Sequence, residues 1–235
     1  MKKRDRAPFL VRLFDPRMWL YDLVKFNGIP FIFFTRLKRI FVTSTGKRKR
    51  GMLSGKFLVA SNHTSVMDPI ILINAFWERR LTFVAMEELF HIKHGRFFSL
   101  IGCIPINRDN VSIETFKQVE RQLYRGHVVA VFPEGALEQT DSLNAFKSGI
   151  ALMAAMSGAD IVPSYIVRRT NKWHRQVVLI GERIKISDYV SSEFPTMDEL
   201  NNLTQTLQQR EAELEHAYQE MQIKKERKKN ENGQV

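Results

Sequence analysis

Short apolar runs alternate with helical stretches from residue 57 onward. Five runs rich in Val, Ile and Phe have the length and composition of strands, at 57–60, 81–85, 128–132, 161–167 and 176–180. Helical patterns lie between them, at 69–77, 111–124 and 146–157. Most of the apolar runs have few polar positions, which is typical of strands covered on both faces. We therefore predict an α/β fold, with a mixed, mostly parallel sheet flanked by helices.

The first 56 residues follow a different pattern, in which turns separate two short apolar segments. Asp15 before Pro16 indicates the start of a helix over 17–26, and a second helix is predicted from residue 30 to about residue 42. Aromatic residues on the second helix stand beside Lys and Arg. This combination suits a helical hairpin in the headgroup region of an anionic membrane. The alternative is a helical pair packed on the domain, with a solvated basic loop.

The end of the chain has the pattern of a polar helix. Thr196 and Glu199 form a capping box, and apolar residues at spacings of three, four or seven predict an amphipathic helix over 200–218. The charged end from residue 224 is expected to be frayed. The chain thus divides into a hairpin with its linker, an α/β core and a helix with its tail, at 1–56, 57–190 and 191–235.

Positive charge is concentrated in the hairpin segment. The 235 residues include 36 Lys and Arg and 25 Asp and Glu, but residues 1–56 hold 15 Lys and Arg against 3 Asp and Glu. This asymmetry favours an anionic membrane surface as a partner. Nucleic acid is not an expected partner, because neither zinc-finger spacing nor an aromatic RNA-binding strand accompanies the charge.

Features that the sequence lacks restrict the expected location of the protein in the cell. The longest uncharged stretch near the start, 26–35, is about half of what a membrane-spanning helix needs. The basic start is not followed by a cleavage site of small residues, so no signal peptide is predicted. With Cys103 alone, no internal disulfide and no Cys-pair zinc site are expected. We expect a peripheral or monotopic protein at the cytoplasmic face of the cell membrane.

The first candidate for chemistry is the segment NHTSVMDP, directly after the strand predicted at 57–60. If the loop folds back, Asp68 can accept a hydrogen bond from one ring nitrogen of His63. The other nitrogen is then free to take a proton from a hydroxyl group, as a general base does. In the alternative interpretation, Asp68 caps the helix opened by Pro69 and His63 is an ordinary loop residue.

Three further segments place polar residues where strands end or helices begin. GCIPINR puts Arg108 after a short apolar run, where a guanidinium can bind phosphate through two hydrogen bonds. FPEG ends a buried strand and presents Glu134 and Gly135 at the same sheet edge as His63. FKSG opens a helix, where Lys147 and backbone N–H groups can hold an anion. Each segment alone also fits an ordinary surface turn.

The four blocks in this order resemble the glycerolipid acyltransferase family, which includes bacterial lysophosphatidate acyltransferases. The resemblance covers residues 57–182 and rests on NHTSVMDP, GCIPINR, FPEG with FKSG, and IVPSYI. It implies transfer of a fatty acyl group from acyl-CoA or acyl carrier protein to a glycerol hydroxyl. It also implies that His63 is the general base, Asp68 orients it, Arg108 binds phosphate, and Glu134 with Gly135 positions the acceptor.

The implied reaction suits these residue types and needs no further group. The thioester is already activated, so neither a metal, a cofactor nor a covalent enzyme intermediate is required. Cys103 is then a packing residue, and backbone N–H groups near the His63 loop are expected to stabilise the oxyanion. The expected product is phosphatidate, made from 1-acylglycerol-3-phosphate in phospholipid biosynthesis.

The chain departs from the family pattern at two places that bear on the acceptor. Ala136, Leu137 and Glu138 stand where the family usually has Thr and Arg after FPEG, and Met86-Glu87-Glu88 stands where a lysine is usual. Recognition of a phosphomonoester then depends on Arg108 and Lys147. Two alternatives follow: an acyltransferase for another lysolipid or polar acceptor, or a catalytically silent protein that binds the membrane surface.

Overall fold

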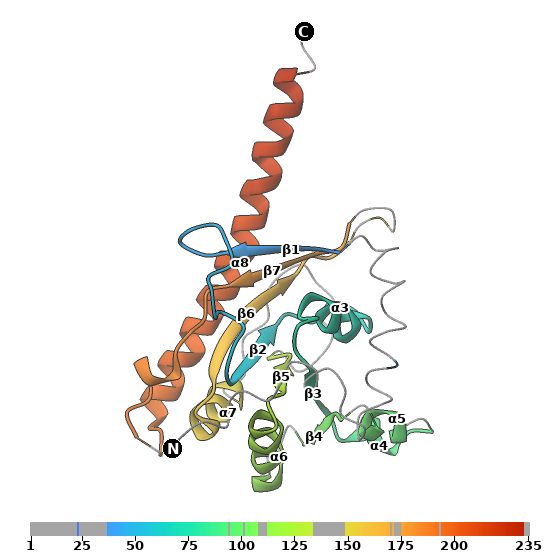
Figure 1. Cartoon of the computed structure of the whole chain (residues 1–235), viewed down its shortest axis with the longest axis vertical. Coiled ribbons are helices and arrows are strands. Elements are labelled where there is room, and N and C mark those ends of the chain that lie inside the picture. The colour runs from blue at the N-terminus through green and yellow to red at the C-terminus, as the bar shows by residue number, and fades with distance from the viewer. Residues whose placement is uncertain are drawn as a thin grey trace.

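A computed structural model of the chain describes residue 23 and residues 37–93, 95–100, 102–107, 112–133, 149–169, 171, 175–192 and 194–232. Within these residues the chain forms a seven-stranded sheet in the order β1-β7-β6-β2-β5-β3-β4 (Figure 1). The strands are β1 (Lys38–Val42), β2 (Phe57–Ser61), β3 (Leu81–Met86), β4 (Ile104–Ile106), β5 (Val128–Val131), β6 (Asp160–Ile166) and β7 (Val177–Gly181). β6 and β7 pair antiparallel, and the other neighbouring strands pair parallel. The predicted α/β fold with a mostly parallel sheet is confirmed.

Helices cover both faces of the sheet. They are α3 (Asp68–Ala75), α4 (Glu88–His91), α5 (Gly95–Leu100), α6 (Ile113–Tyr124), α7 (Gly149–Ser157) and α8 (Met197–Asn232), with a 3₁₀ turn, η2 (Ile186–Asp188). Residues of α3 share one apolar core with Phe57 and Val59 of β2. Residues of α6, α7 and α8 share the other core with Leu58 and Ala60. All five residues of β2 are buried because successive side chains enter opposite cores.

The elements predicted from residue 57 onward lie close to where the apolar pattern placed them. Strands β2, β3, β5, β6 and β7 begin within one residue of the predicted positions. Helices α3 and α6 begin within two residues of theirs, and α7 ends where predicted, while residues 146–148 lie outside the described part of the chain. The short helices α4 and α5 were not predicted, since four and six residues are too few for a clear helical period.

The predicted helix from residue 30 to about residue 42 is wrong at its end. Residues 38–42 form strand β1, which pairs parallel with β7, so that Ile40 lies beside Leu179. Ile40 and Val42 pack in one apolar cluster with β7, while Phe41 packs against the core on the other face. The edge of β7 thus determines a strand where the local pattern favours a helix. The sheet therefore includes residues before the predicted division at 57.

Apart from residue 23, which is helical and exposed, the rest of the predicted hairpin, over 17–26 and most of the second helix, lies outside the described residues. The basic linker that follows β1 is described, and two of its cations pair with acidic residues of the core, as does Arg39 of β1. Arg39 and Arg48 both bind the carboxylate of Glu78, each at 2.8 Å, and Lys49 donates to Glu182. These cations are therefore partly neutralised within the domain.

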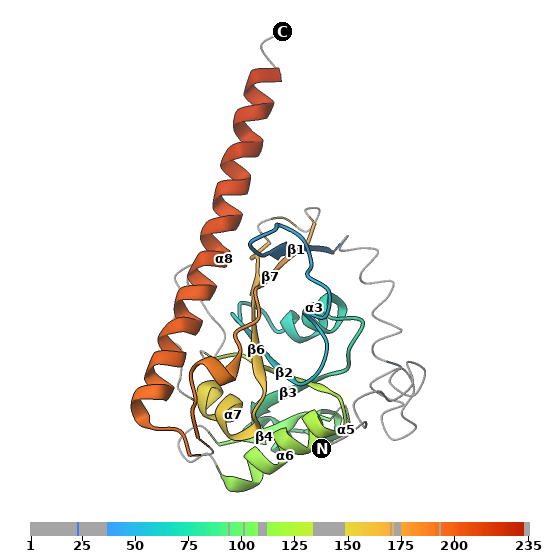
Figure 2. The same ribbon diagram turned by 60° about the vertical axis from the view of Figure 1, so that its left-hand side comes forward.

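The C-terminal helix starts with the predicted capping box and is longer than predicted. Glu199 N donates to Thr196 Oγ1 at 3.2 Å, and Thr196 N donates to Glu199 Oε2 at 2.8 Å. The bond from Thr196 N to the carboxylate, with others from Ser191, lowers the pKa of Glu199 to about 2. The frayed end predicted from residue 224 is wrong, because α8 continues to Asn232 (Figure 2). Lys, Glu and Arg are strong helix formers, and Glu220 pairs with Lys224 one turn later.

Gly181 marks a tight contact between the sheet and α8. A Cβ atom at this position would lie 2.9 Å from Pro163 Cγ and 3.3 Å from Leu214 Cδ2. We expect Gly181→Ala to lower the free energy of unfolding by about 1–3 kcal/mol, because β6 or α8 must shift. Urea unfolding followed by circular dichroism measures this change. Gly46→Ala is a poor control because φ is +65° there, whereas Gly149 has open space around a Cβ and is a suitable one.

Candidate active site

The candidate site lies at the carboxyl edge of the parallel strands. His63 follows the end of β2, and Phe132 follows the end of β5, which is the neighbour of β2 in the sheet. Parallel strands bring their carboxyl ends to one edge of a sheet, and ligands of open α/β folds bind there. The order of the strands therefore places these two segments side by side.

The loop between β2 and α3 folds back, so that His63 and Asp68 meet. His63 Nδ1 lies 3.0 Å from Asp68 Oδ2, and the Asp68 side chain is 1% exposed. An ionised carboxylate can only accept, so Nδ1 carries the proton and Nε2 keeps its lone pair. The alternative of a helix cap is not found, because Met67 is the N-cap of α3 and no side chain caps that end.

Asp68 also organises the loop that joins it to His63. Its Oδ2 atom accepts from Thr64 N at 2.6 Å and from Ser65 N at 2.7 Å, in addition to the His63 ring. Two backbone N–H groups of the loop are therefore occupied, so they are not the oxyanion donors that we expected from this region. The other oxygen, Oδ1, is buried and has no hydrogen-bond partner among the described residues.

Phe132 supports the histidine ring from one side. The rings of His63 and Phe132 are stacked, with centroids 4.1 Å apart and planes inclined by 17°. Phe83 of β3 lies behind Phe132, with ring centroids 6.1 Å apart. The imidazole is thus fixed by a hydrogen bond at Nδ1 and by an aromatic ring on one face. The sequence contained Phe132 in the FPEG block, but its contact with His63 was not predicted.

Asn62 fastens the loop to the neighbouring strand. Its Nδ2 atom donates to Ile166 O at 3.0 Å, and Ile166 N donates to Asn62 Oδ1 at 2.7 Å. The side chain is fully buried, so both of its polar atoms satisfy backbone groups at the end of β6. This amide pair continues the β2–β6 pairing one residue beyond β2 and fixes the backbone just before His63.

Comparison with known proteins identifies the family. The sequence profile of the acyltransferase family matches residues 39–167, which is more than half of the chain. The chain belongs to the acyltransferase family. The matched segment includes β1 and extends through β6, so it contains His63, Asp68, Asn62 and Phe132.

Relatives within the acyltransferase family include two probable 1-acyl-sn-glycerol-3-phosphate acyltransferases. That of Mycoplasma pneumoniae is 34% identical over 146 residues, which are 58% of this chain and 52% of the relative. That of Mycoplasma genitalium is 36% identical over 124 residues, which are 49% of this chain and 45% of the relative. The chain thus spans about half the length of these curated relatives.

A solved acyltransferase structure shares the fold. The crystal structure of the 1-acyl-sn-glycerophosphate (LPA) acyltransferase PlsC from Thermotoga maritima superposes with a TM-score of 0.58 and 19% sequence identity. The match covers 86% of this chain and 81% of the PlsC chain. At this identity, the likeness shows the arrangement of strands and helices alone.

The other candidate site residues in this member of the acyltransferase family lie outside the described part of the chain. They are Arg108, Glu134, Gly135 and Lys147. Their described neighbours are the end of β4 at Ile106, the turn at Pro133 after β5, and the start of α7 at Gly149. β4 and β5 both end at the edge that carries His63. The roles of these four residues remain predictions.

Cys103 is unsuited to nucleophilic chemistry at neutral pH. Burial raises the pKa of its thiol to about 12, against a smaller lowering effect of a backbone hydrogen bond from Phe83. The thiolate is therefore scarcely populated. Cys103 packs instead against the core on the α3 side of the sheet. Within the described residues, no group of three His, Cys, Asp or Glu side chains is arranged to hold a metal ion.

Proposed function

We propose that this chain transfers a fatty acyl group from an acyl thioester to the free hydroxyl of a lysophospholipid. The preferred acceptor is 1-acylglycerol-3-phosphate, which gives phosphatidate for phospholipid biosynthesis. The observation that carries this proposal is the His63–Asp68 pair, whose geometry leaves Nε2 of His63 available as a base. The two Mycoplasma relatives, which are probable 1-acyl-sn-glycerol-3-phosphate acyltransferases, support the same acceptor.

In the proposed mechanism, His63 moves one proton in each direction. Nε2 takes the proton of the acceptor hydroxyl as the oxygen attacks the thioester carbonyl, and the tetrahedral intermediate forms. The intermediate then expels the thiolate, which receives the proton from the imidazolium. Asp68 stabilises the imidazolium through its hydrogen bond to Nδ1. The activated thioester supplies the leaving group, so the proposal includes no cofactor and no covalent enzyme intermediate.

Recognition of the two substrates is assigned to residues outside the described part of the chain. Arg108 and Lys147 are proposed to bind the phosphate of the acceptor, and Glu134 with Gly135 to position its glycerol. The donor is acyl-CoA or an acylated acyl carrier protein. After FPEG this chain has Ala136, Leu137 and Glu138, where the family usually has Thr and Arg. The region therefore lacks one hydroxyl and one cation, and for this reason a second lysolipid acceptor is included in the test.

The reaction is proposed to take place at the cytoplasmic face of the cell membrane, with the chain bound peripherally or as a monotopic protein. In the part of the chain that the structure describes, no helix combines the length and apolar character needed to cross a bilayer. The proposal also places residues 1–56 in the headgroup region of anionic lipid, because this segment has a large excess of Lys and Arg.

Acyl transfer by the purified protein on anionic vesicles tests the proposal. The donor is long-chain acyl-CoA or acyl carrier protein that carries a long-chain acyl group. We expect turnover with lysophosphatidate and a kcat/KM at least roughly tenfold lower with lysophosphatidylcholine, because only lysophosphatidate carries a phosphomonoester for Arg108. A higher kcat/KM with lysophosphatidylcholine would support the proposed acyl transfer but contradict the proposed acceptor. Absence of turnover with both acceptors and both donors, in a folded and membrane-bound protein, would favour the catalytically silent alternative.

A further inference from the structure

The end of α8 extends beyond the domain. Up to Tyr218 the helix packs on the sheet, with Leu203, Leu207 and Leu214 buried. Among the described residues after Tyr218, none belongs to an apolar core, and Figures 1 and 2 both show this part of α8 projecting past β1. We call residues 219–232 the overhang. Burial in the apolar cores of this domain therefore does not explain the sequence of the overhang.

Lysine replaces leucine on the side of α8 that faces the sheet. Five of the six residues from 224 to 229 are Lys or Arg. Lys225 follows Tyr218 by seven residues, and Lys228 follows the buried Leu214 by fourteen. Because seven residues make nearly two turns, these two helix positions continue the packed face. Lys224 and Lys229 lie on its two flanks, so the four lysines together form what we call the lysine face.

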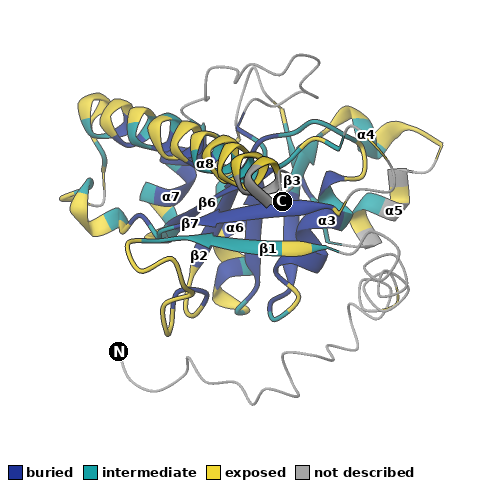
Figure 3. Ribbon diagram, turned by 90° about the horizontal axis from the view of Figure 1, so that it is seen from above, coloured by how far each residue is buried: buried dark blue, intermediate teal, exposed yellow. Residues whose placement is uncertain are grey.

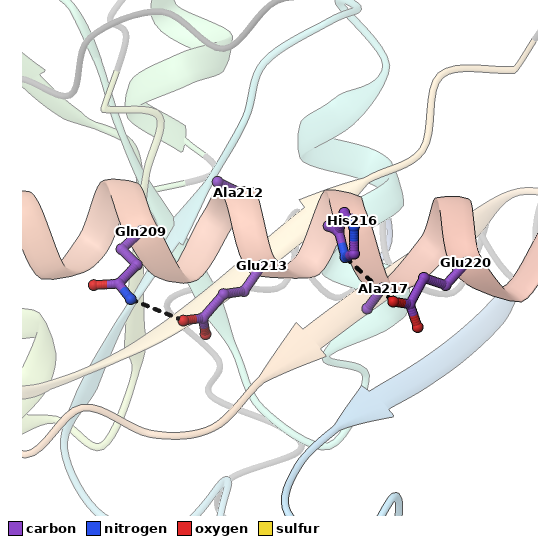
Figure 4. A pocket seen from close by; sticks show the side chains of 6 residues that line it. All are labelled: Gln209, Ala212, Glu213, His216, Ala217 and Glu220. Carbon is purple, nitrogen blue, oxygen red and sulfur yellow. Dashed lines mark hydrogen bonds and ion pairs between the residues drawn. The ribbon is translucent and has the colours of Figure 1, made fainter.

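The adjoining side of α8 has the opposite charge. A shallow hollow runs along it, lined by Gln209, Ala212, Glu213, His216, Ala217 and Glu220 (Figure 4). Glu213 accepts from Gln209 at 3.2 Å, and Glu220 Oε1 lies 3.6 Å from His216 Nδ1. Glu220 thus pairs with His216 on this side and, through Oε2, with Lys224 at 3.4 Å on the flank of the lysine face. Glu231 follows Lys224 by seven residues, so the positive charge is concentrated at the helix positions of Lys225, Lys228 and Lys229.

A second basic element begins where α8 leaves the sheet. Val42, the last residue of β1, lies in the same apolar cluster as Leu214 and Tyr218. The loop after Val42 carries Lys47 and Arg50, both exposed. Figure 3 shows β1 and α8 on the same side of the domain. The β1 edge is therefore flanked by cations from two segments that are far apart in the sequence.

The chemistry of the overhang favours a broad anionic surface over other partners. A coiled coil with a second copy needs apolar residues at the positions that Lys225 and Lys228 occupy. Lysine presents a compact point charge, whereas the planar guanidinium of arginine matches single phosphates or carboxylates. A row of lysines therefore suits a field of many headgroups, and the choice of lipid rests on the proposed function, whose acceptor and product are membrane lipids.

We propose that the lysine face of the overhang, together with Lys47 and Arg50, binds the surface of an anionic membrane. This contact is additional to any made by the N-terminal segment. It binds the β1 edge of the domain to the bilayer through charge, without burying a large apolar surface.

Vesicle co-sedimentation of the full chain tests the contact without requiring turnover. The probe is phosphatidylcholine vesicles with and without phosphatidylglycerol, at low ionic strength. In the test variant, Lys224, Lys225, Lys228 and Lys229 are all changed to Gln, which preserves helix propensity. We expect its partition onto the anionic vesicles to fall roughly 100-fold, because each lysine near an anionic surface contributes separately. Added salt should reduce binding of the wild type far more than that of the variant.

A matched control removes the same charge elsewhere. Lys93, Lys117, Arg121 and Arg125 are exposed residues around α4 and α6, away from the β1 edge. Changing these four to Gln should alter the partition by less than roughly threefold. Equal losses in both variants would mean that net charge alone governs binding, which overturns the proposal. Unchanged vesicle binding by the overhang variant overturns the proposal too. So does a result in which this variant loses binding to an RNA probe but keeps its binding to the vesicles.

The test also separates this contact from catalysis. The overhang variant should keep wild-type turnover with a short-chain lysophospholipid that is monomeric in solution, and lose turnover on anionic vesicles. If the wild type shows no acyl transfer at all, the proposed function fails, while the sedimentation result still decides whether the overhang binds lipid. Loss of turnover with the monomeric acceptor would overturn a purely membrane-binding role.

Discussion

His63→Ala is expected to lower kcat for acyl transfer by roughly 10³-fold, the range that loss of a general base produces. The alcohol of a glycerolipid is a poor nucleophile unless its proton is removed in the transition state. Only His63 among the described residues of the site combines a free ring nitrogen with a buried carboxylate at the other nitrogen. Initial rates with saturating lysophosphatidate and acyl-CoA on anionic vesicles measure the effect.

Two companion variants show whether this loss reflects the base itself. His63→Gln retains a polar side chain of similar size without a basic nitrogen, so it should be as inactive as His63→Ala. Cys103→Ala removes a thiol that is protonated at neutral pH, and it should retain most of the activity. Thermal unfolding of all three proteins checks that they are folded. Activity of His63→Ala above about a tenth of the wild type would show that another group accepts the proton.

Asp68→Asn should lower kcat by roughly 10²- to 10³-fold, with little change in KM or in stability. The amide oxygen can take the place of Oδ2 and accept from His63, Thr64 and Ser65 as before. The amide nitrogen takes the place of Oδ1, for which the described residues offer no hydrogen-bond partner. What the substitution removes is the negative charge that stabilises the imidazolium. Steady-state kinetics and urea unfolding of the same preparations measure both quantities.

Asp68→Ala separates the structural contribution of Asp68 from its charge. Alanine leaves three donors without their acceptor, so the free energy of unfolding should fall by about 3 kcal/mol. If Asp68→Asn is destabilised as much as Asp68→Ala, the carboxylate has mainly a structural role in the loop. If Asp68→Asn retains full activity, its charge takes no part in proton transfer.

The sequence predicts most of the sheet and misses its first strand for a physical reason. The runs that became β2, β5 and β6 are apolar at nearly every position, because helices cover both faces of the sheet. β1 lies at the edge and mixes cations with aromatic and branched residues, a pattern that also fits a helix. Its strand conformation depends on pairing with β7, a partner that no local pattern indicates.

In the candidate site too, a contact between residues close in the sequence was predicted, whereas contacts between residues far apart in the sequence were not. The His63–Asp68 contact spans five residues, so spacing alone made it a hypothesis. The bonds of Asn62 to Ile166 span 104 residues, and the stack of Phe132 on His63 joins two separate strands. These contacts depend on the order β6-β2-β5, which the sequence does not specify.

The pairing of β1 with β7 has a consequence for folding during synthesis. β1 is the first strand of the described sheet to be made, yet its partner at Val177–Gly181 is the last. At about 5–20 residues per second, the ribosome needs roughly seven to thirty seconds to produce that partner. During this interval β1 must stay unpaired at an open edge, where misplaced strands and aggregation are hazards. Until β7 is made, the charged side chains of Lys38 and Arg39 in β1 disfavour pairing with a wrong strand.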